Sequence, residues 1–130
     1  DFYFLDAVGA AVWLLGFVIE NFADSQMATF RATPALKGTL IQTGLWRYSR
    51  HPNYFGEALL WWGIYLIACS VYLGWVTIFA PIWITILVRF ISGVPLLEKK
   101  YKDREDWKIY CRETNVFVPW FVRKVDKSAY

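Results

Sequence analysis

The sequence predicts an all-α protein, built as a membrane-embedded helical bundle of about three transmembrane helices with an interfacial helical tail. Hydrophobic residues make up 57% and aromatic residues 20% of the chain, which is more than a small soluble domain usually carries. The apolar residues are also clustered, because residues 58–88 contain no Asp, Glu, Lys or Arg. At 130 residues the chain has room for one compact unit, so we expect residues 1–130 to form a single membrane domain.

The first predicted span covers residues 5–23. Residues 7–19 carry no charge, and flanking apolar residues extend this run to the roughly 17 to 25 residues that a span needs. A buried or interfacial helix is the alternative. The first six residues contain no Lys or Arg, which argues against a secretory signal peptide. Because the chain begins with Asp, we expect a fragment or a processed form of a longer protein.

The uncharged run at residues 58–88 is too long for one span. As a single helix it would extend about 46 Å, whereas the hydrocarbon core of a membrane is about 30 Å thick. Polar and flexible residues at 70–74 suit an interfacial turn. The run is therefore predicted to fold back as two spans, near residues 55–71 and 74–95, followed by a tail at residues 96–130.

The basic residues indicate the orientation. All 14 Lys and Arg residues lie after the first span, in the tail, or in the last turns of the third span. The positive-inside rule then places this loop and tail on the cytoplasmic side, or its organellar equivalent. Basic residues that flank membrane spans argue against nucleic acid as a partner. With one histidine, and with Cys69 and Cys111 predicted at different depths, neither a metal site nor a disulfide is expected.

Charged residues within or beside the spans are candidates for function, because such charges are costly in a membrane. Folding the hairpin at residues 70–74 brings Glu57 and Arg89 to a similar depth, as an ion pair or facing a wet pocket. Alternatively, Arg89 reaches to the head groups and Glu57 lies in the first turn of its helix. Glu20 and Asp24 share one helical face, so either a cation lies between them or the helix has reached water.

The segment at residues 44–57, GLWRYSRHPNYFGE, is the densest in chemically capable groups. Arg47 and Arg50 suit phosphate or carboxylate, because a planar guanidinium donates hydrogen bonds in pairs. His51 can transfer a proton near neutral pH. Gly56 leaves room for the close approach of a ligand or a second helix. The alternative is a set of interfacial side chains that anchor a helix.

This segment resembles the signature shared by steroid 5α-reductase-like proteins, sterol C14-reductases and isoprenylcysteine carboxyl methyltransferases. Three further stretches, at residues 20–26, 89–98 and 110–121, resemble the DUF1295 membrane proteins that are grouped with the 5α-reductases. The four stretches occur in the same order as in that family and cover roughly residues 7–122.

The resemblance implies an all-helical fold whose last helices and tail enclose a cofactor pocket, open to the cytoplasmic side. The cofactor is NADPH in the reductases and S-adenosylmethionine in the methyltransferases. The absence of a Gly-x-Gly-x-x-Gly element agrees with a site unlike a Rossmann fold. Ten residues would line or brace the pocket: Asp24, Arg47, Arg50, His51, Asn53, Tyr54, Glu57, Arg89, Glu98 and Tyr110.

The expected function is reduction of a double bond in a steroid or lipid by NADPH. The alternatives are an S-adenosylmethionine-dependent methyltransferase and a non-catalytic subunit that binds the other subunits of a membrane complex. In the 5α-reductases the substrate is activated by groups from upstream helices, so no catalytic residue is assigned within this chain. Membrane lipids are expected partners. The resemblance implies the endoplasmic reticulum membrane, and a mitochondrial inner membrane satisfies the same charge asymmetry.

Overall fold

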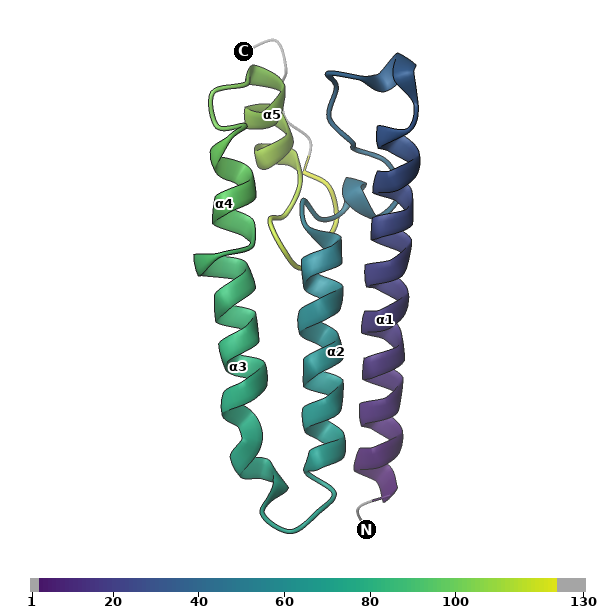
Figure 1. The fold of residues 1–130 in the computed structure, drawn as a ribbon, viewed down its shortest axis with the longest axis vertical. Coiled ribbons are helices and arrows are strands. Elements are labelled where there is room, and N and C mark those ends of the chain that lie inside the picture. The colour runs from purple at the N-terminus through teal and green to yellow at the C-terminus, as the bar shows by residue number, and fades with distance from the viewer. Residues whose placement is uncertain (1–2, 124–130) are drawn as a thin grey trace.

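The computed structural model describes residues 3–123, and these residues form helices joined by short turns (Figure 1). The α-helices are α1 (Tyr3–Arg31), α2 (Pro52–Ala68), α3 (Phe79–Ile86), α4 (Val94–Lys99) and α5 (Glu105–Glu113). The described residues contain no β-strand, only an isolated bridge between Ser49 and Asn115. The all-α prediction is confirmed.

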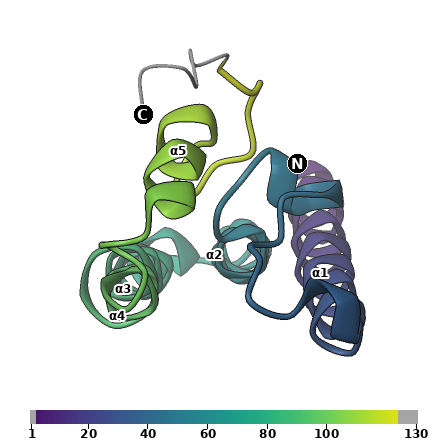
Figure 2. The ribbon, with the colours of Figure 1, turned by 90° about the horizontal axis from the view of Figure 1, so that it is seen from above.

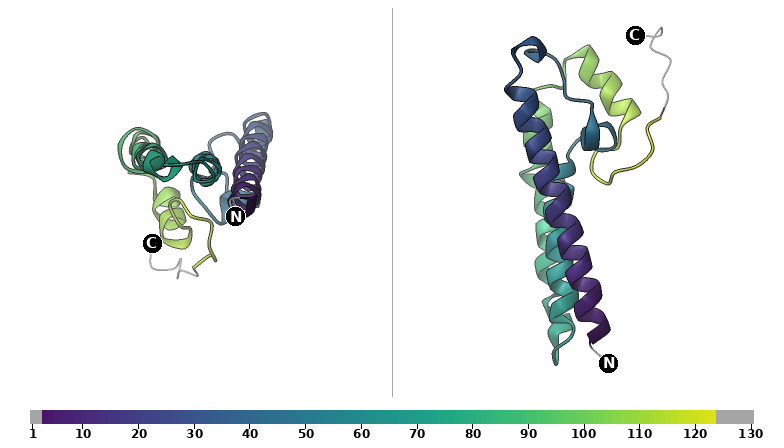
Figure 3. Two further views of the ribbon diagram at one scale, coloured as in Figure 1. Left: turned by 90° about the horizontal axis from the view of Figure 1, so that it is seen from below. Right: turned by 90° about the vertical axis from the view of Figure 1, so that its right-hand side faces the viewer.

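The long helices stand side by side in a shallow row, with α2 between α1 and the column made by α3 and α4 (Figures 1 and 2). Helix α5 and the segment after it lie against one face of this row, at the end opposite the start of α1 (Figure 3). Two small apolar clusters hold that end together. Ile41 and Trp46 pack on Ala23 of α1, while Phe117 packs on Ala58 of α2.

Helix α1 continues to Arg31 rather than ending near residue 23, and therefore carries its polar end beyond the expected span. Its sequence from residue 17 onward contains no Gly or Pro until Pro34. Thr33 is extended, as is typical of a residue before proline, and the helix has ended by this point. The additional turns bring Arg31 to the same end of the molecule as α5.

Helices α1 and α2 touch along a line of small residues. Gly9 and Gly16 are spaced seven residues apart on α1, as are Gly56 and Gly63 on α2. A Cβ added to Gly16 would lie 2.6 Å from the Gly56 carbonyl oxygen, and one added to Gly9 would lie 2.7 Å from that of Gly63. Small residues of this kind let membrane helices pack backbone to backbone. Of the two uses predicted for Gly56, the structure shows the approach of a second helix.

The predicted turn at residues 70–74 is confirmed, since α2 ends at Ala68 and a 3-10 segment begins at Gly74. The third column is interrupted further along. A π-helical turn at Leu87–Ile91 follows α3, and Gly93 separates it from α4. The π-helical turn lies within the third predicted span, residues 74–95, and α4, which begins near the end of that span, carries Glu98.

Two helical stretches, Phe4–Arg31 and Gly74–Lys99, are long and apolar enough to cross a membrane. Helix α2, with 17 residues, is at the short end of the range for a span. Large apolar side chains are exposed on the outer faces, among them Phe4, Phe22 and Phe79. Lipid chains would cover these surfaces, so the fold is that of a membrane protein.

Candidate functional site

The turn that precedes α2 is held in place by the segment after α5. The Ser49 hydroxyl donates to the Phe117 carbonyl (2.6 Å) and accepts from the His51 amide (3.1 Å). The Arg50 amide donates to the Asn115 carbonyl at 2.9 Å. Pro52 then starts α2 in the first-turn position that proline favours. These bonds fix the backbone on both sides of Arg50 and His51.

Helix α5 and α1 are joined to the same turn through two aromatic side chains. The Tyr110 hydroxyl donates to the Trp46 carbonyl, and the Trp46 indole donates to the Ala23 carbonyl at 3.0 Å. Burial raises the pKa of Tyr110 well above its ordinary value, so its hydroxyl keeps the proton that it donates. Tyr110 therefore acts as a structural link between α5 and the turn.

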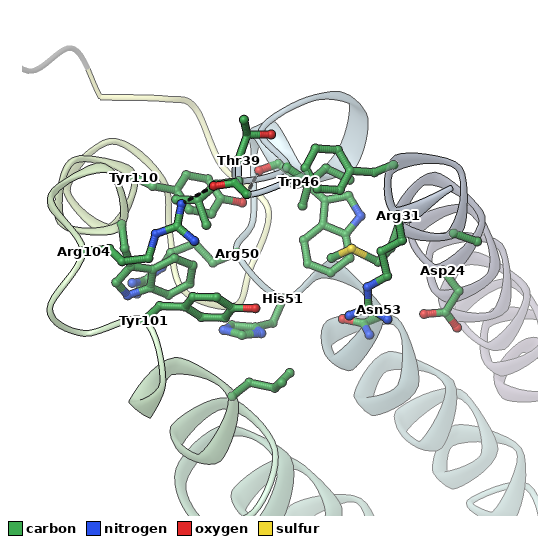
Figure 4. A pocket seen from close by; sticks show the side chains of 18 residues that line it. Asp24, Arg31, Thr39, Trp46, Arg50, His51, Asn53, Tyr101, Arg104 and Tyr110 are labelled. Carbon is green, nitrogen blue, oxygen red and sulfur yellow. Dashed lines mark hydrogen bonds between the residues drawn. The ribbon is translucent and has the colours of Figure 1, made fainter. Parts of the chain in front are cut away.

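A cavity of about 570 Å³ opens between the end of α1, the loop after it and α5 (Figure 4). In the close-up, Arg31 and Asp24 of α1 face Tyr101, Arg104 and Tyr110 across it. The size is in the usual range for ligand and cofactor sites. Its charged or polar lining includes Asp24, Arg31, Arg50, His51, Asn53 and Arg104, and its aromatic lining includes Phe30, Trp46, Tyr101, Trp107 and Tyr110.

The cavity is predominantly positive, because three arginines and one aspartate line it within the described residues. The Arg104 guanidinium donates to both carboxylate oxygens of Asp106, at 3.0 and 2.7 Å, and to the Gly38 carbonyl at 2.8 Å. Through these hydrogen bonds, the Arg104 guanidinium connects the loop after α1 to the start of α5. Hydrogen bonding to Arg104 lowers the pKa of Asp106, as expected for an ionised partner.

Glu98 of α4 joins the cavity to the third helical column. Its carboxylate lies 2.5 Å from His51 Nε2 and 3.4 Å from Arg50 Nη1. Arg50 also contacts the Cys111 thiol, and its guanidinium carbon lies 5.8 Å from the centre of the Trp107 ring. Burial is the main cause that raises the pKa of Cys111, so the thiol form is favoured there.

Three buried polar atoms at the cavity have no hydrogen-bond partner among residues 3–123: Arg50 Nε, His51 Nδ1 and Asn53 Oδ1. The His51 residue is only 3% exposed. An unpaired buried polar group costs about 1–3 kcal/mol, so such atoms usually bind a water or a ligand. All three residues line the same cavity, so the unpaired atoms lie within its wall.

The structure brings half of the predicted site residues to this cavity. Two further predicted residues contact the cavity residue His51. The Glu98 carboxylate pairs with its imidazole, and the Tyr54 ring stacks on it with 5.7 Å between centroids. The residues that line the cavity are Asp24, Arg50, His51, Asn53 and Tyr110.

The remaining three predicted residues lie away from the cavity lining. Arg47 pairs with Glu113 at 3.4 Å and so connects the turn to the end of α5. The structure shows no ion pair between Glu57 and Arg89 in the part of the chain that it describes. The Arg89 guanidinium instead lies over the Phe90 ring, 4.6 Å from its centre.

Several cavity residues were not among the ten predicted ones. Arg31 follows Asp24 by seven residues, which is two helical turns, and a longer first helix would have placed both on one face. Trp107 and Tyr101 are recognisable only as aromatic residues in a charged tail. Nothing in the local sequence separates Arg104 from its basic neighbours.

The chain was compared with known proteins. It is 29% identical to an uncharacterised protein of Schizosaccharomyces pombe over 88% of the chain and 39% of that protein. It is 27% identical to the Delta(14)-sterol reductase of Arabidopsis thaliana, over 87% of the chain and 32% of the reductase. It is 33% identical to the 3-oxo-5-alpha-steroid 4-dehydrogenase 1 of Bos taurus, over 52% of the chain and 26% of that enzyme.

The chain therefore spans less than two-fifths of the length of these curated relatives. No solved structure matches it. The model of the family described as "Protein of unknown function (DUF1295)" matches residues 1–114, which is most of the chain. The motifs that resemble this family lie largely within the matched region, and the cavity is built mainly from it. The chain belongs to the DUF1295 family.

Proposed function

We propose that this chain forms the cofactor-binding part of a membrane reductase, which uses NADPH to reduce a double bond of a steroid or lipid. The observation that carries the proposal is the cavity in which Arg31, Arg50 and Arg104 meet beside three unpaired buried polar atoms. Two relatives, named as a sterol reductase and a steroid dehydrogenase, support the reaction class. The group that activates the substrate is proposed to lie outside this chain.

The three arginines are proposed to bind the phosphates of the cofactor. A guanidinium donates paired hydrogen bonds that match the geometry of phosphate oxygens. Arg31 is the freest to do so, since it is exposed at the end of α1. Arg104 already holds Asp106 and Gly38, so it would fix the loop and α5 around the phosphates.

The aromatic lining is proposed to hold the flat rings of the cofactor. Trp46, Tyr101 and Trp107 line the cavity, and ring faces of this kind favour stacked or edge-to-face neighbours. NADPH supplies the hydride, while the protein supplies orientation and electrostatics. Arg47 and Glu98 are proposed to brace the turn and not to touch the cofactor, in keeping with their pairing to Glu113 and His51.

The alternative cofactor is S-adenosylmethionine, which carries a sulfonium cation. Asp24 and the aromatic rings would suit a cation, but the arginines would repel it. Binding of both molecules therefore has to be measured side by side. A chain that binds neither would fit the third possibility, a non-catalytic membrane subunit.

The test is isothermal titration calorimetry of the full chain in lipid nanodiscs, with NADPH, NADH and S-adenosylmethionine. Arg31→Gln is the informative variant, because Arg50 also supports Glu98 and Cys111 and its loss would disturb the fold. Lys108→Gln, at an exposed position on α5, is the control. We expect NADPH to bind, more weakly at high salt, and Arg31→Gln to weaken it about ten-fold.

Binding of S-adenosylmethionine without NADPH would instead support a methyltransferase. Binding of neither molecule would contradict both enzymatic proposals. An equal loss of affinity in Arg31→Gln and Lys108→Gln would mean that Arg31 has no specific role at the cavity.

A further inference from the structure

The segment that follows α5, residues 114–121, carries three large apolar side chains that are exposed. Val118 is 52%, Trp120 62% and Phe121 76% exposed. Tyr48, whose carbonyl accepts a hydrogen bond from the Trp120 amide at 3.1 Å, is 47% exposed. We call these four residues the aromatic patch. Neighbouring apolar side chains of this size mark a surface that contacts a partner or a membrane.

Helix α5 itself presents no such surface. Its two large aromatic residues, Trp107 and Tyr110, are buried against the turn before α2. Its exposed positions are all charged: Glu105, Asp106, Lys108 and Arg112. A helix that lies in a membrane interface turns its apolar face toward the lipid, whereas α5 turns its apolar face toward the protein. Within the described part of the tail, the aromatic patch is therefore the surface suited to lipid.

Phe117 fixes the depth of the aromatic patch relative to α2. Its ring packs edge-on against Phe55, with 5.6 Å between the ring centres, and packs on Ala58. Ala58 lies three residues inside the predicted span 55–71, which corresponds to about 5 Å along a helix. Figure 1 shows the segment descending from α5 toward α2 and then turning back. Val118 directly follows Phe117, so the patch begins at the edge of the span.

Arginines lie beside the aromatic patch. Arg123 is exposed, and its guanidinium donates to the Arg112 carbonyl at 3.0 Å and to Asn115 Oδ1 at 2.6 Å. Arg47 directly precedes Tyr48, and its side chain is 42% exposed. Trp and Tyr favour the head-group level of a membrane, where arginine can reach the phosphates. Apolar rings with cations beside them therefore match a phospholipid interface, and they continue the lipid-facing surface of the helices.

We propose that Val118, Trp120 and Phe121 insert into the interfacial layer of the membrane that the helices span, with Arg47 and Arg123 at the level of the phospholipid phosphates. The inference is independent of the proposed cofactor, because none of these five residues lines the cavity. The same segment holds the turn before α2 through hydrogen bonds, so its contact with the membrane also fixes that turn.

The first test measures the depth of position 121 by electron paramagnetic resonance, with the chain in phosphatidylcholine nanodiscs. Phe121→Cys carries a nitroxide label in a chain that also has Cys69→Ser and Cys111→Ala. Lys108→Cys in the same background is the control, because Lys108 is exposed on α5. Oxygen concentrates among lipid chains and a nickel chelate stays in water, so the ratio of their collision rates with the label reports depth. We expect this ratio to be several-fold higher at position 121 than at position 108.

A second measurement needs no substitution. The wild-type chain is irradiated in nanodiscs that contain a phosphatidylcholine with a diazirine near its head group, and is then digested with trypsin. Cleavage after Arg112 and Arg123 releases residues 113–123 as one peptide, while residues 109–112 of α5 form another. Mass spectrometry should find lipid adducts several-fold more often on the peptide 113–123.

Three results would overturn the proposal, and circular dichroism first establishes that each labelled variant is folded. Equal ratios at positions 121 and 108 would place the aromatic patch in water. Few collisions with either reagent at position 121 would mean that another protein, or a second copy of this chain, covers the patch. Equal lipid adducts on the two peptides would contradict the proposal without any variant, so this measurement decides even if a labelled chain fails to fold.

Discussion

His51 Nε2 lies 2.5 Å from Glu98 Oε2, and this contact joins the start of α2 to the short helix α4. Forty-seven residues separate the two side chains in the sequence. The contact holds the imidazole of a residue that is almost fully buried and that lines the cavity. Glu98 therefore links the stability of this end of the fold to the arrangement of the cavity.

Replacing Glu98 with Ala should destabilise the fold by about 2 kcal/mol, because His51 and Arg50 both lose their carboxylate acceptor. The free energy of unfolding is measured in detergent micelles by denaturant titration. Glu105→Ala is the control, since the Glu105 side chain is 72% exposed and pairs only at the surface. An equally small effect of both substitutions would show that the Glu98 contacts contribute little.

Gly16→Leu should separate α1 from α2 and lower the free energy of unfolding by at least about 2 kcal/mol. The reason is steric, since even a Cβ at this position would lie 2.6 Å from the Gly56 carbonyl oxygen. Ala10→Leu adds the same side chain at an exposed position on α1 and should be tolerated. If the two substitutions had equal effects, the glycine contact would not hold the helices together.

Tyr110→Phe should lower the free energy of unfolding by about 1–2 kcal/mol, because the Trp46 carbonyl loses its donor. The difference should depend on pH. The folded state raises the pKa of Tyr110, so its stabilising effect is complete below the ordinary tyrosine pKa of about 10 and declines as the pH rises above it. Unfolding titrations at pH 8 and at about pH 11 should therefore show a smaller difference between wild type and variant at the higher pH.

Arg104→Gln should change stability little, since both side chains of the Arg104–Asp106 pair are more than a third exposed. It should nevertheless weaken NADPH binding several-fold, because Arg104 lines the cavity and holds its loop. Denaturant titration and calorimetry on the same preparation separate the two effects. A large loss of stability with unchanged affinity would assign Arg104 a purely structural role.

The parts of this structure that follow from local composition could be predicted from the sequence. The uncharged run and its interruption at residues 70–74 predict two antiparallel helices, because a membrane limits helix length. The crowding of polar groups at Arg50, His51 and Asn53 predicts the position of a site, and the structure places all three at one cavity.

Other features depend on packing between distant segments and were not evident from the sequence. Helix α1 continues to Arg31 because no Gly or Pro stops it, although its hydrophobic span ends earlier. The pairing of Glu98 with His51 requires the π-helical turn and the break at Gly93, neither of which has a periodic signal. Glu57 and Arg89 lie at the two ends of the uncharged run, but similar depth in a membrane does not bring two side chains into contact.

The most direct test of the account is a crystal structure of the chain determined with NADPH. We predict electron density for the cofactor in the cavity, with its phosphates near Arg31, Arg50 and Arg104. An empty cavity at a concentration that saturates binding in the calorimeter, or NADPH bound at another surface, would contradict the assignment of this cavity as the cofactor site.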